Sequence, residues 1–243
     1  MENNNPDYVY DNVMQIDDAA SSRKFLANVF LWMFIALGVS AFCAYAFATT
    51  PSLMQLMVDE TTQQLSGLGY VIMFAPLAFV MLISFGLNRL SYPVLALLFV
   101  AYAAITGMSL SFILLIYTAS SILSVFISSS LLFGVMAVAG YTTQQDLTKF
   151  GSIMMMGLFG IIIASVVNMF MHSSGLDMAI SYIGVAVFIG LTAYDVQKLK
   201  RIGAGLEYGD ASAKKYALMG GLTLYLDFIN LFLMLLRVFG RRR

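Results

Sequence analysis

Seven apolar runs, separated by short polar segments, constrain the fold of this 243-residue chain more than any other feature. They cover residues 26–49, 68–88, 93–117, 120–141, 152–171, 178–197 and 216–237. A helix of about 20 such residues spans the hydrocarbon core of a bilayer. Only 11% of the residues are charged, which is too few to cover the surface of a soluble domain. The sequence therefore predicts an all-α, polytopic membrane protein.

Polarity divides the chain into three parts. Residues 1–24 are expected to form a flexible, polar cytoplasmic tail, residues 25–238 a seven-helix transmembrane domain, and residues 239–243 a basic C-terminal tail. No basic stretch precedes an apolar one near the N-terminus, so we expect no cleaved signal peptide. Because the net charge is zero, we expect no nucleic-acid partner. The chain has a single cysteine, Cys43, which rules out an internal disulfide and a Cys-based metal cluster. No cofactor is expected.

The basic residues between the runs predict the orientation in the membrane. With the N-terminus in the cytoplasm, the outer loops carry no Lys or Arg, whereas the inner segments carry nine: Arg23, Lys24, Arg89, Lys149, Lys198, Lys200, Arg201, Lys214 and Lys215. This asymmetry follows the positive-inside rule and predicts a protein of the cell (inner) membrane with a cytoplasmic N-terminus. The last run leaves two alternatives. A full crossing puts Arg237 and residues 241–243 outside the cell, whereas a re-entrant segment brings them back to the cytoplasmic side. Its length favours the full crossing.

An ionisable residue, Asp227, stands in the middle of the last apolar run. A carboxylate at the centre of a bilayer costs roughly 2.5 to 3.5 kcal/mol, so it needs a proton, a cation or a hydrogen-bonding partner. Thr223 and Asn230 lie about one turn to either side and could take part in a purely structural hydrogen bond. Ionisable residues inside a membrane more often mark ion paths or proton relays.

A second carboxyl group, that of Asp195, lies near the end of the preceding run, one turn before Lys198. It could form an interfacial ion pair with that lysine. Alternatively, Asp195 and Asp227 approach each other and titrate as a coupled pair that shares a proton. Such a pair can sense protons, bind a calcium ion through its oxygens, or cleave peptides as an aspartyl dyad. Asp146, beside Lys149, is expected to be a solvated loop carboxylate or a helix cap.

Three stretches combine polar residues with the apolar background of the spans: "AGYTTQQDLTKFGSIMMMGLFGIIIASVVNMF" (139–170), "IGVAVFIGLTAYDVQKLK" (183–200) and "KKYALMGGLTLYLDFINLFLMLLR" (214–237). At these residues the sequence resembles the Bax inhibitor-1 family (transmembrane BAX inhibitor motif proteins), particularly its bacterial members. The resemblance covers most of the chain after residue 25.

The resemblance implies a seven-helix bundle in which six helices surround a buried C-terminal helix. It also implies a pH-sensitive calcium leak whose sensor is a pair of buried aspartates, here Asp195 and Asp227, which would be the sites of proton and possible calcium binding. An arginine of the second helix pairs with one of them in the family, and Arg89 is the candidate for this gating latch. Two features depart from the family pattern: an acidic residue within helix two is missing, and the loop between the two aspartates is longer.

Two other functions stay open. The chain could be a non-transporting regulatory protein that binds membrane partners such as proteases or stress-response components. It could also be an intramembrane aspartyl protease, since Tyr194-Asp195 matches the "YD" of that class. The partner motif of such proteases is Gly-x-Gly-Asp, whereas bulky residues precede Asp227 here. We therefore expect no enzyme, and we expect the bilayer, calcium ions, protons and membrane proteins as partners.

Overall fold

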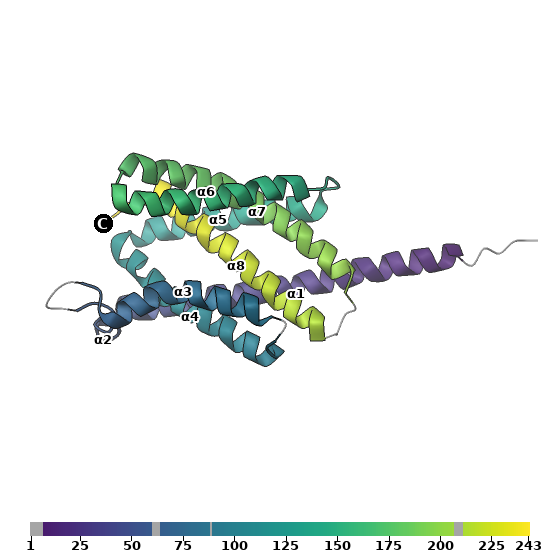
Figure 1. Ribbon diagram of the computed structural model, residues 1–243, viewed down its shortest axis with the longest axis horizontal. Helices are drawn as coiled ribbons and strands as arrows, with labels where there is room; N and C mark the ends of the chain where they lie inside the picture. The colour runs from purple at the N-terminus through teal and green to yellow at the C-terminus, as the bar shows by residue number, and fades with distance from the viewer. Residues whose placement is uncertain (1–6, 60–63, 88, 207–210) are drawn as a thin grey trace, which may run out of the picture.

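The structure is a computed structural model that describes residues 7–59, 64–87, 89–206 and 211–243 (Figure 1). Its elements are α1 (Asp7–Thr49), α2 (Pro51–Met54), α3 (Gly67–Gly86), α4 (Tyr92–Ile116), α5 (Ala119–Thr142), α6 (Thr148–Met171), α7 (Ser174–Ala204) and α8 (Ala211–Phe239). Among the described residues there are seven helices long and apolar enough to cross a membrane, and α2 is not one of them. The predicted all-α, polytopic fold is confirmed.

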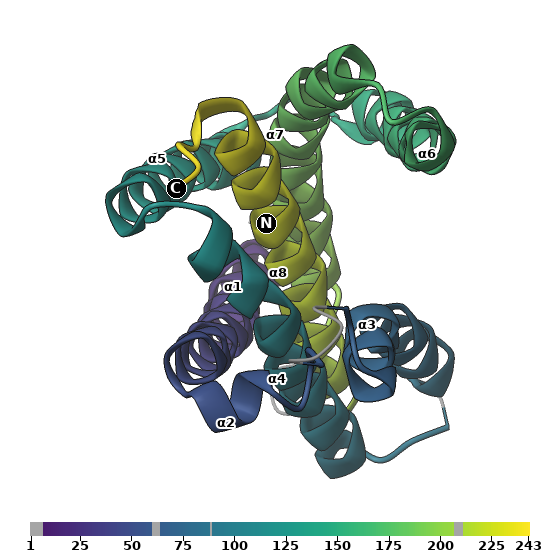
Figure 2. The same ribbon diagram turned by 90° about the vertical axis from the view of Figure 1, so that its left-hand side faces the viewer.

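The C-terminal helix α8 runs through the middle of the bundle. It packs against α1, α4, α5 and α7, and Figure 2 shows these helices around it. Leu218, Leu224, Tyr225 and Leu231 of α8 have no exposed surface. The two remaining spans are peripheral, since α3 packs mainly on α4 and α6 mainly on α7. The last helix is therefore buried as expected, but four helices rather than six make most of its contacts.

The spans alternate between two sides of the bundle. The N-terminus, the α3–α4 connection and the α5–α6 connection lie on one side, here called the N-terminal side, and the α4–α5 turn, the α6–α7 turn and the C-terminus lie on the other, the C-terminal side (Figure 1). Helix α8 is continuous and ends on the side opposite its start. The structure therefore has no reversal in α8 of the kind that a re-entrant segment requires.

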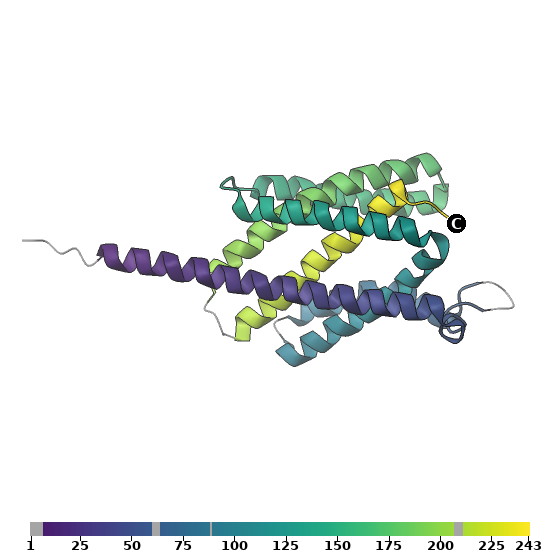
Figure 3. The ribbon, with the colours of Figure 1, turned by 180° about the vertical axis from the view of Figure 1, so that it is seen from behind.

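Helix α1 begins outside the bundle and joins it near residue 22. Residues 7–24, expected to belong to a flexible tail, are helical, and Figure 3 shows α1 extending beyond the other helices. No Gly or Pro follows Pro6 in the tail, so nothing in the sequence ends this helix before the membrane. The Ser22 hydroxyl donates to the Lys200 carbonyl (Oγ–O 2.9 Å). Residues 1–6 lie outside the described part of the chain.

Small residues bring the helix backbones close together. A Cβ atom added to Gly140 of α5 would collide with the backbone of Ala193 on α7, and one added to Gly107 of α4 would collide with Ser40 on α1. Both glycines are therefore required where two helices touch without intervening side chains. Gly160 of α6, in contrast, faces open space.

Candidate functional site

The crossing of α7 and α8 brings together two acidic residues, Asp195 and Asp227. Their carboxyl groups lie within hydrogen-bonding reach of each other. Both are buried, with exposed fractions of 9% for Asp195 and 6% for Asp227. A hydrogen bond between two carboxyl groups requires a proton on one of them. The contact therefore requires at least one proton on the pair.

The neighbouring polar residues of α8 do not bind Asp227. The Thr223 hydroxyl donates to the Met219 carbonyl (Oγ1–O 3.1 Å), and the Asn230 amide donates to the Leu226 carbonyl (Nδ2–O 2.9 Å). Both side chains therefore bond to their own helix. Within the part of the chain that the structure describes, Asp227 Oδ2 is buried and has no hydrogen-bond donor. A structural bond of Asp227 to the rest of the bundle is therefore made with Asp195 of α7 and not within this stripe.

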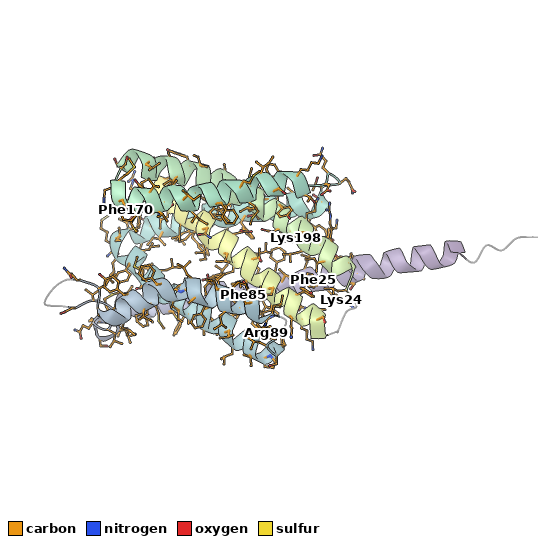
Figure 4. All side chains as sticks on the ribbon, in the orientation of Figure 1. Lys24, Phe25, Phe85, Arg89, Phe170 and Lys198 are labelled. Carbon is orange, nitrogen blue, oxygen red and sulfur yellow. The ribbon has the colours of Figure 1, made fainter. Side chains whose placement is uncertain are left out.

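Two basic residues were candidates for pairing with these carboxyl groups. Lys198 lies close enough to act on Asp195 through its charge, but its ammonium group is exposed and lies 5.9 Å from the centre of the Tyr194 ring. Arg89 follows the end of α3, is exposed, and lies beside the start of α4 (Figure 4). Neither basic residue forms an ion pair with Asp195 or Asp227 in the described structure.

Arg89 stays away from the acid pair because α3 ends at Gly86 and packs mainly on α4. The structure thus brings the two aspartates together and leaves the predicted latch at the edge of the bundle. Near this end of α3, the Lys215 ammonium of α8 donates a long hydrogen bond to the Leu87 carbonyl (Nζ–O 3.4 Å).

A buried glutamine beside the acid pair escaped the sequence analysis. The Gln197 amide accepts a hydrogen bond from the Leu147 backbone (N–Oε1 2.9 Å) and donates one to the Gln145 carbonyl (Nε2–O 2.7 Å). The Lys200 ammonium donates to the Tyr141 carbonyl (Nζ–O 2.8 Å). These bonds fix the α5–α6 connection to the end of α7 that carries Asp195. The sequence held one signal of this role, since Gln197 is a long, uncharged polar residue near the end of an apolar run.

Asp146 is an exposed carboxylate of the α5–α6 connection, directly before Leu147, the N-cap residue of α6. Its carboxylate accepts hydrogen bonds from the Thr148 backbone (N–Oδ1 3.0 Å) and hydroxyl (Oγ1–Oδ1 2.6 Å). Its ionic partner is Arg201 of α7 (Nη2–Oδ1 2.9 Å) rather than the neighbouring Lys149. The bonds from Thr148, together with Arg201, lower the pKa of Asp146 to about 2.

A second buried polar group lies two residues before Asp227. The Ser40 hydroxyl donates to the Ala103 carbonyl (Oγ–O 2.7 Å), so the Tyr225 hydroxyl must be the donor in the 2.7 Å contact between Tyr225 and Ser40. This chain of bonds ties α8 to α1 and α4. It fixes the rotation of α8 about its axis and hence the direction in which Asp227 points.

An apolar cavity adjoins this segment of α8. Its volume is about 300 Å³, and it lies between α1, α4, α5 and α8. Phe228, directly after Asp227, lines it and packs edge-to-face against Phe126 and Phe133 of α5, with ring centres 5.6 Å apart in both pairs.

Comparisons with known proteins place the chain in a family. The family model described as "Inhibitor of apoptosis-promoting Bax1" matches residues 22–243. The chain belongs to the Bax inhibitor-1 family. It is 45% identical over 229 residues to the inner membrane protein YbhL of Escherichia coli K12, covering 94% of this chain and 96% of that relative. It is also 44% identical over 221 residues to an uncharacterized protein of Borreliella burgdorferi, covering 91% of this chain and 93% of the relative.

The acid pair of this Bax inhibitor-1 protein offers few ligands to a resident metal ion. Two carboxylates supply up to four oxygens, whereas calcium takes six to eight. In the described residues no group of three or more His, Cys, Asp or Glu side chains is placed to hold a metal. Water or backbone carbonyls would have to complete a calcium shell at this pair.

Proposed function

We propose that this chain is a pH-sensitive leak for calcium ions in the inner membrane, with Asp195 and Asp227 as its sensor of protons and cations. The observation that carries the proposal is the contact between their two buried carboxyl groups, which form no ion pair with Lys or Arg in the described structure. Membership of the Bax inhibitor-1 family supports it, and so does the inner-membrane relative.

The chemistry of the pair couples protons to cations. With one shared proton it carries one negative charge. Two carboxylates roughly 4 Å apart repel each other by about 4 kcal/mol at an effective dielectric constant of about 20. Losing the shared proton therefore creates a site that a divalent cation stabilises, and gaining a second proton removes the charge altogether. Each change in protonation alters the force between α7 and α8.

Arg89 acts on this pair only when α3 moves toward α8. In the structure its side chain is exposed, and α3 is held mainly by α4, so such a movement disrupts few contacts. An arginine that reached the pair would stabilise its charged form. Arg89→Gln should then change calcium flux more than Arg23→Gln, which removes the same charge on the same side. Equal effects of the two variants would mean that Arg89 only helps to set the orientation of the protein in the membrane.

The two alternatives differ in what they require. A protease needs open backbone before its second aspartate, whereas Leu224 and Tyr225 fill this space and are fully buried. The same contact between carboxyl groups would suit a protease, but the packing before Asp227 favours the leak. A non-transporting regulatory protein needs no acid pair, and no feature of the described residues favours it over the leak.

Calcium flux into liposomes that contain the purified protein tests the proposal. Uptake should exceed that of empty liposomes and should change across a pH series between about 6 and 8. A protein that is folded and inserted but passes no calcium at any pH contradicts the leak. Retention of a membrane protein partner by such a protein would support the regulatory alternative.

A further inference from the structure

A groove of about 510 Å³ lies between α5 and α8 on the C-terminal side. One wall carries Ser120, Ser124 and Ser128, which are spaced by four residues and therefore share one face of α5. All three are exposed, in a helix whose other exposed side chains include Leu123 and Leu131. Polar side chains of a membrane helix usually face protein or water, so their place on the outer surface marks this face of α5 as a candidate contact site.

The groove changes from polar to apolar along its length. Arg241 lies at its mouth, and the serines follow inward along α5. Leu132 of α5 and Leu235 of α8 line the deeper part. Ser120 and Leu132 are separated by about 18 Å along the helix axis, given a rise of about 1.5 Å per residue. The groove therefore reaches from the membrane surface well into the depth of the hydrocarbon.

The position of Arg241 is fixed by backbone bonds. Its N–H donates to the Ser121 hydroxyl (N–Oγ 2.9 Å), and its carbonyl accepts from the Thr118 backbone (N–O 3.1 Å). The chain turns back at Gly240, where a Cβ atom would collide with the carbonyl of Leu236. These contacts hold the tail at the mouth of the groove.

Arg241 also carries a charge that the described residues leave unbalanced. On the same side, Arg237 is paired with Asp177 (Nη1–Oδ1 3.0 Å), whereas Arg241 has no ion pair within the described part of the chain. A basic side chain at the level of the headgroups attracts anionic lipid.

We propose that the groove between α5 and α8 binds an anionic phospholipid. Arg241 pairs with the phosphate, and an acyl chain lies against Leu132 and Leu235. Ser124 and Ser128 lie between these two ends, at the level of the glycerol esters of the lipid, and their hydroxyls donate to carbonyls of their own helix (Oγ–O 2.8 Å and 2.9 Å).

The depth and the charge of the groove select this occupant. A soluble anion would satisfy Arg241 but would leave the apolar inner half without a partner. A zwitterionic lipid would fill the groove but would bring no net charge to the arginine. An anionic phospholipid satisfies both ends and reaches the groove from the bilayer itself.

Native mass spectrometry of the full-length protein in a neutral detergent tests the proposal, with phosphatidylglycerol and phosphatidylcholine as competing probes. The wild-type protein should retain one phosphatidylglycerol molecule in preference to phosphatidylcholine. Arg241→Gln should reduce the preference by about fivefold, since one basic residue contributes about 1 kcal/mol at an anionic surface. Arg237→Gln removes the same charge from the same helix end outside the groove and should preserve the preference.

A second pair of variants tests the groove itself. Ser128→Leu fills it and should abolish the retained lipid, whereas Ser130→Leu, on an exposed position of α5 outside the groove, should not. Glycerol phosphate, the soluble headgroup, should not displace the lipid. Equal retention of the two lipids, equal effects of the two variants in either pair, or displacement by glycerol phosphate would overturn the proposal. Circular dichroism of each variant establishes that a lost lipid reflects the groove and not unfolding.

Discussion

The contact between Asp195 and Asp227 predicts that replacing either residue removes the proton that the two carboxyl groups share. In Asp195→Asn or Asp227→Asn, the new amide can donate to the remaining carboxylate, so the site keeps one negative charge without a shared proton. Calcium flux should then lose its dependence on pH. The ratio of the fluxes at pH 6 and pH 8 should approach one in each single variant, and the double variant should change this ratio little further.

The size of the coupling follows from the bond that the two residues share. A hydrogen bond to a charged group contributes about 1.5 to 3 kcal/mol. A double-mutant cycle with Asp195→Ala and Asp227→Ala, which unlike the Asn variants supply no new donor, should therefore depart from additivity in the free energy of unfolding by that amount, a factor of about 10 to 150 in the equilibrium constant. Asp177→Asn is the matched control, because this carboxylate lies on α7 but pairs with Arg237 at the surface. A wild-type pH profile in both single variants, or additive effects on stability, would refute the coupled pair.

Three further outcomes are expected. Gly140→Val should destabilise the protein by about 1 to 3 kcal/mol by forcing α5 from α7, whereas Gly134→Val, in open space on α5, should leave the melting temperature unchanged. Asp146→Asn should lower the melting temperature at neutral pH; because its pKa is depressed, the carboxylate stabilises the fold above about pH 4, and the difference from wild type should disappear as pH falls through about 2. In a cysteine-free background, Gly205→Cys should react with a membrane-impermeant reagent only from the cytoplasm and Ser173→Cys only from outside; the reverse pattern would contradict the predicted orientation.

The sequence alone determined the number and the class of the membrane-spanning helices, whereas α1, α7 and α8 extend beyond their apolar runs. Each apolar run is a local property of the chain, and the bilayer demands a helix wherever such a run must satisfy its backbone groups in hydrocarbon. The same local argument identified Asp227 as a residue that requires a partner, because the cost of an isolated charge depends on its depth and not on the fold. Asp146 was predicted to be a possible cap from its place before an apolar run.

Only the tertiary structure decided which faces of these helices meet. The spans are apolar on their lipid-facing sides as well as toward the bundle, so the pattern along the chain does not mark the buried face as it does in a soluble helix. The contact of Asp195 with Asp227, the bonds from Gln197 to the α5–α6 connection, and the exposed place of Arg89 all depend on how α7, α8 and α3 are rotated and packed. That packing is set by close contacts such as Gly140 on Ala193, between residues far apart in the sequence, and no local window of the sequence contains both partners.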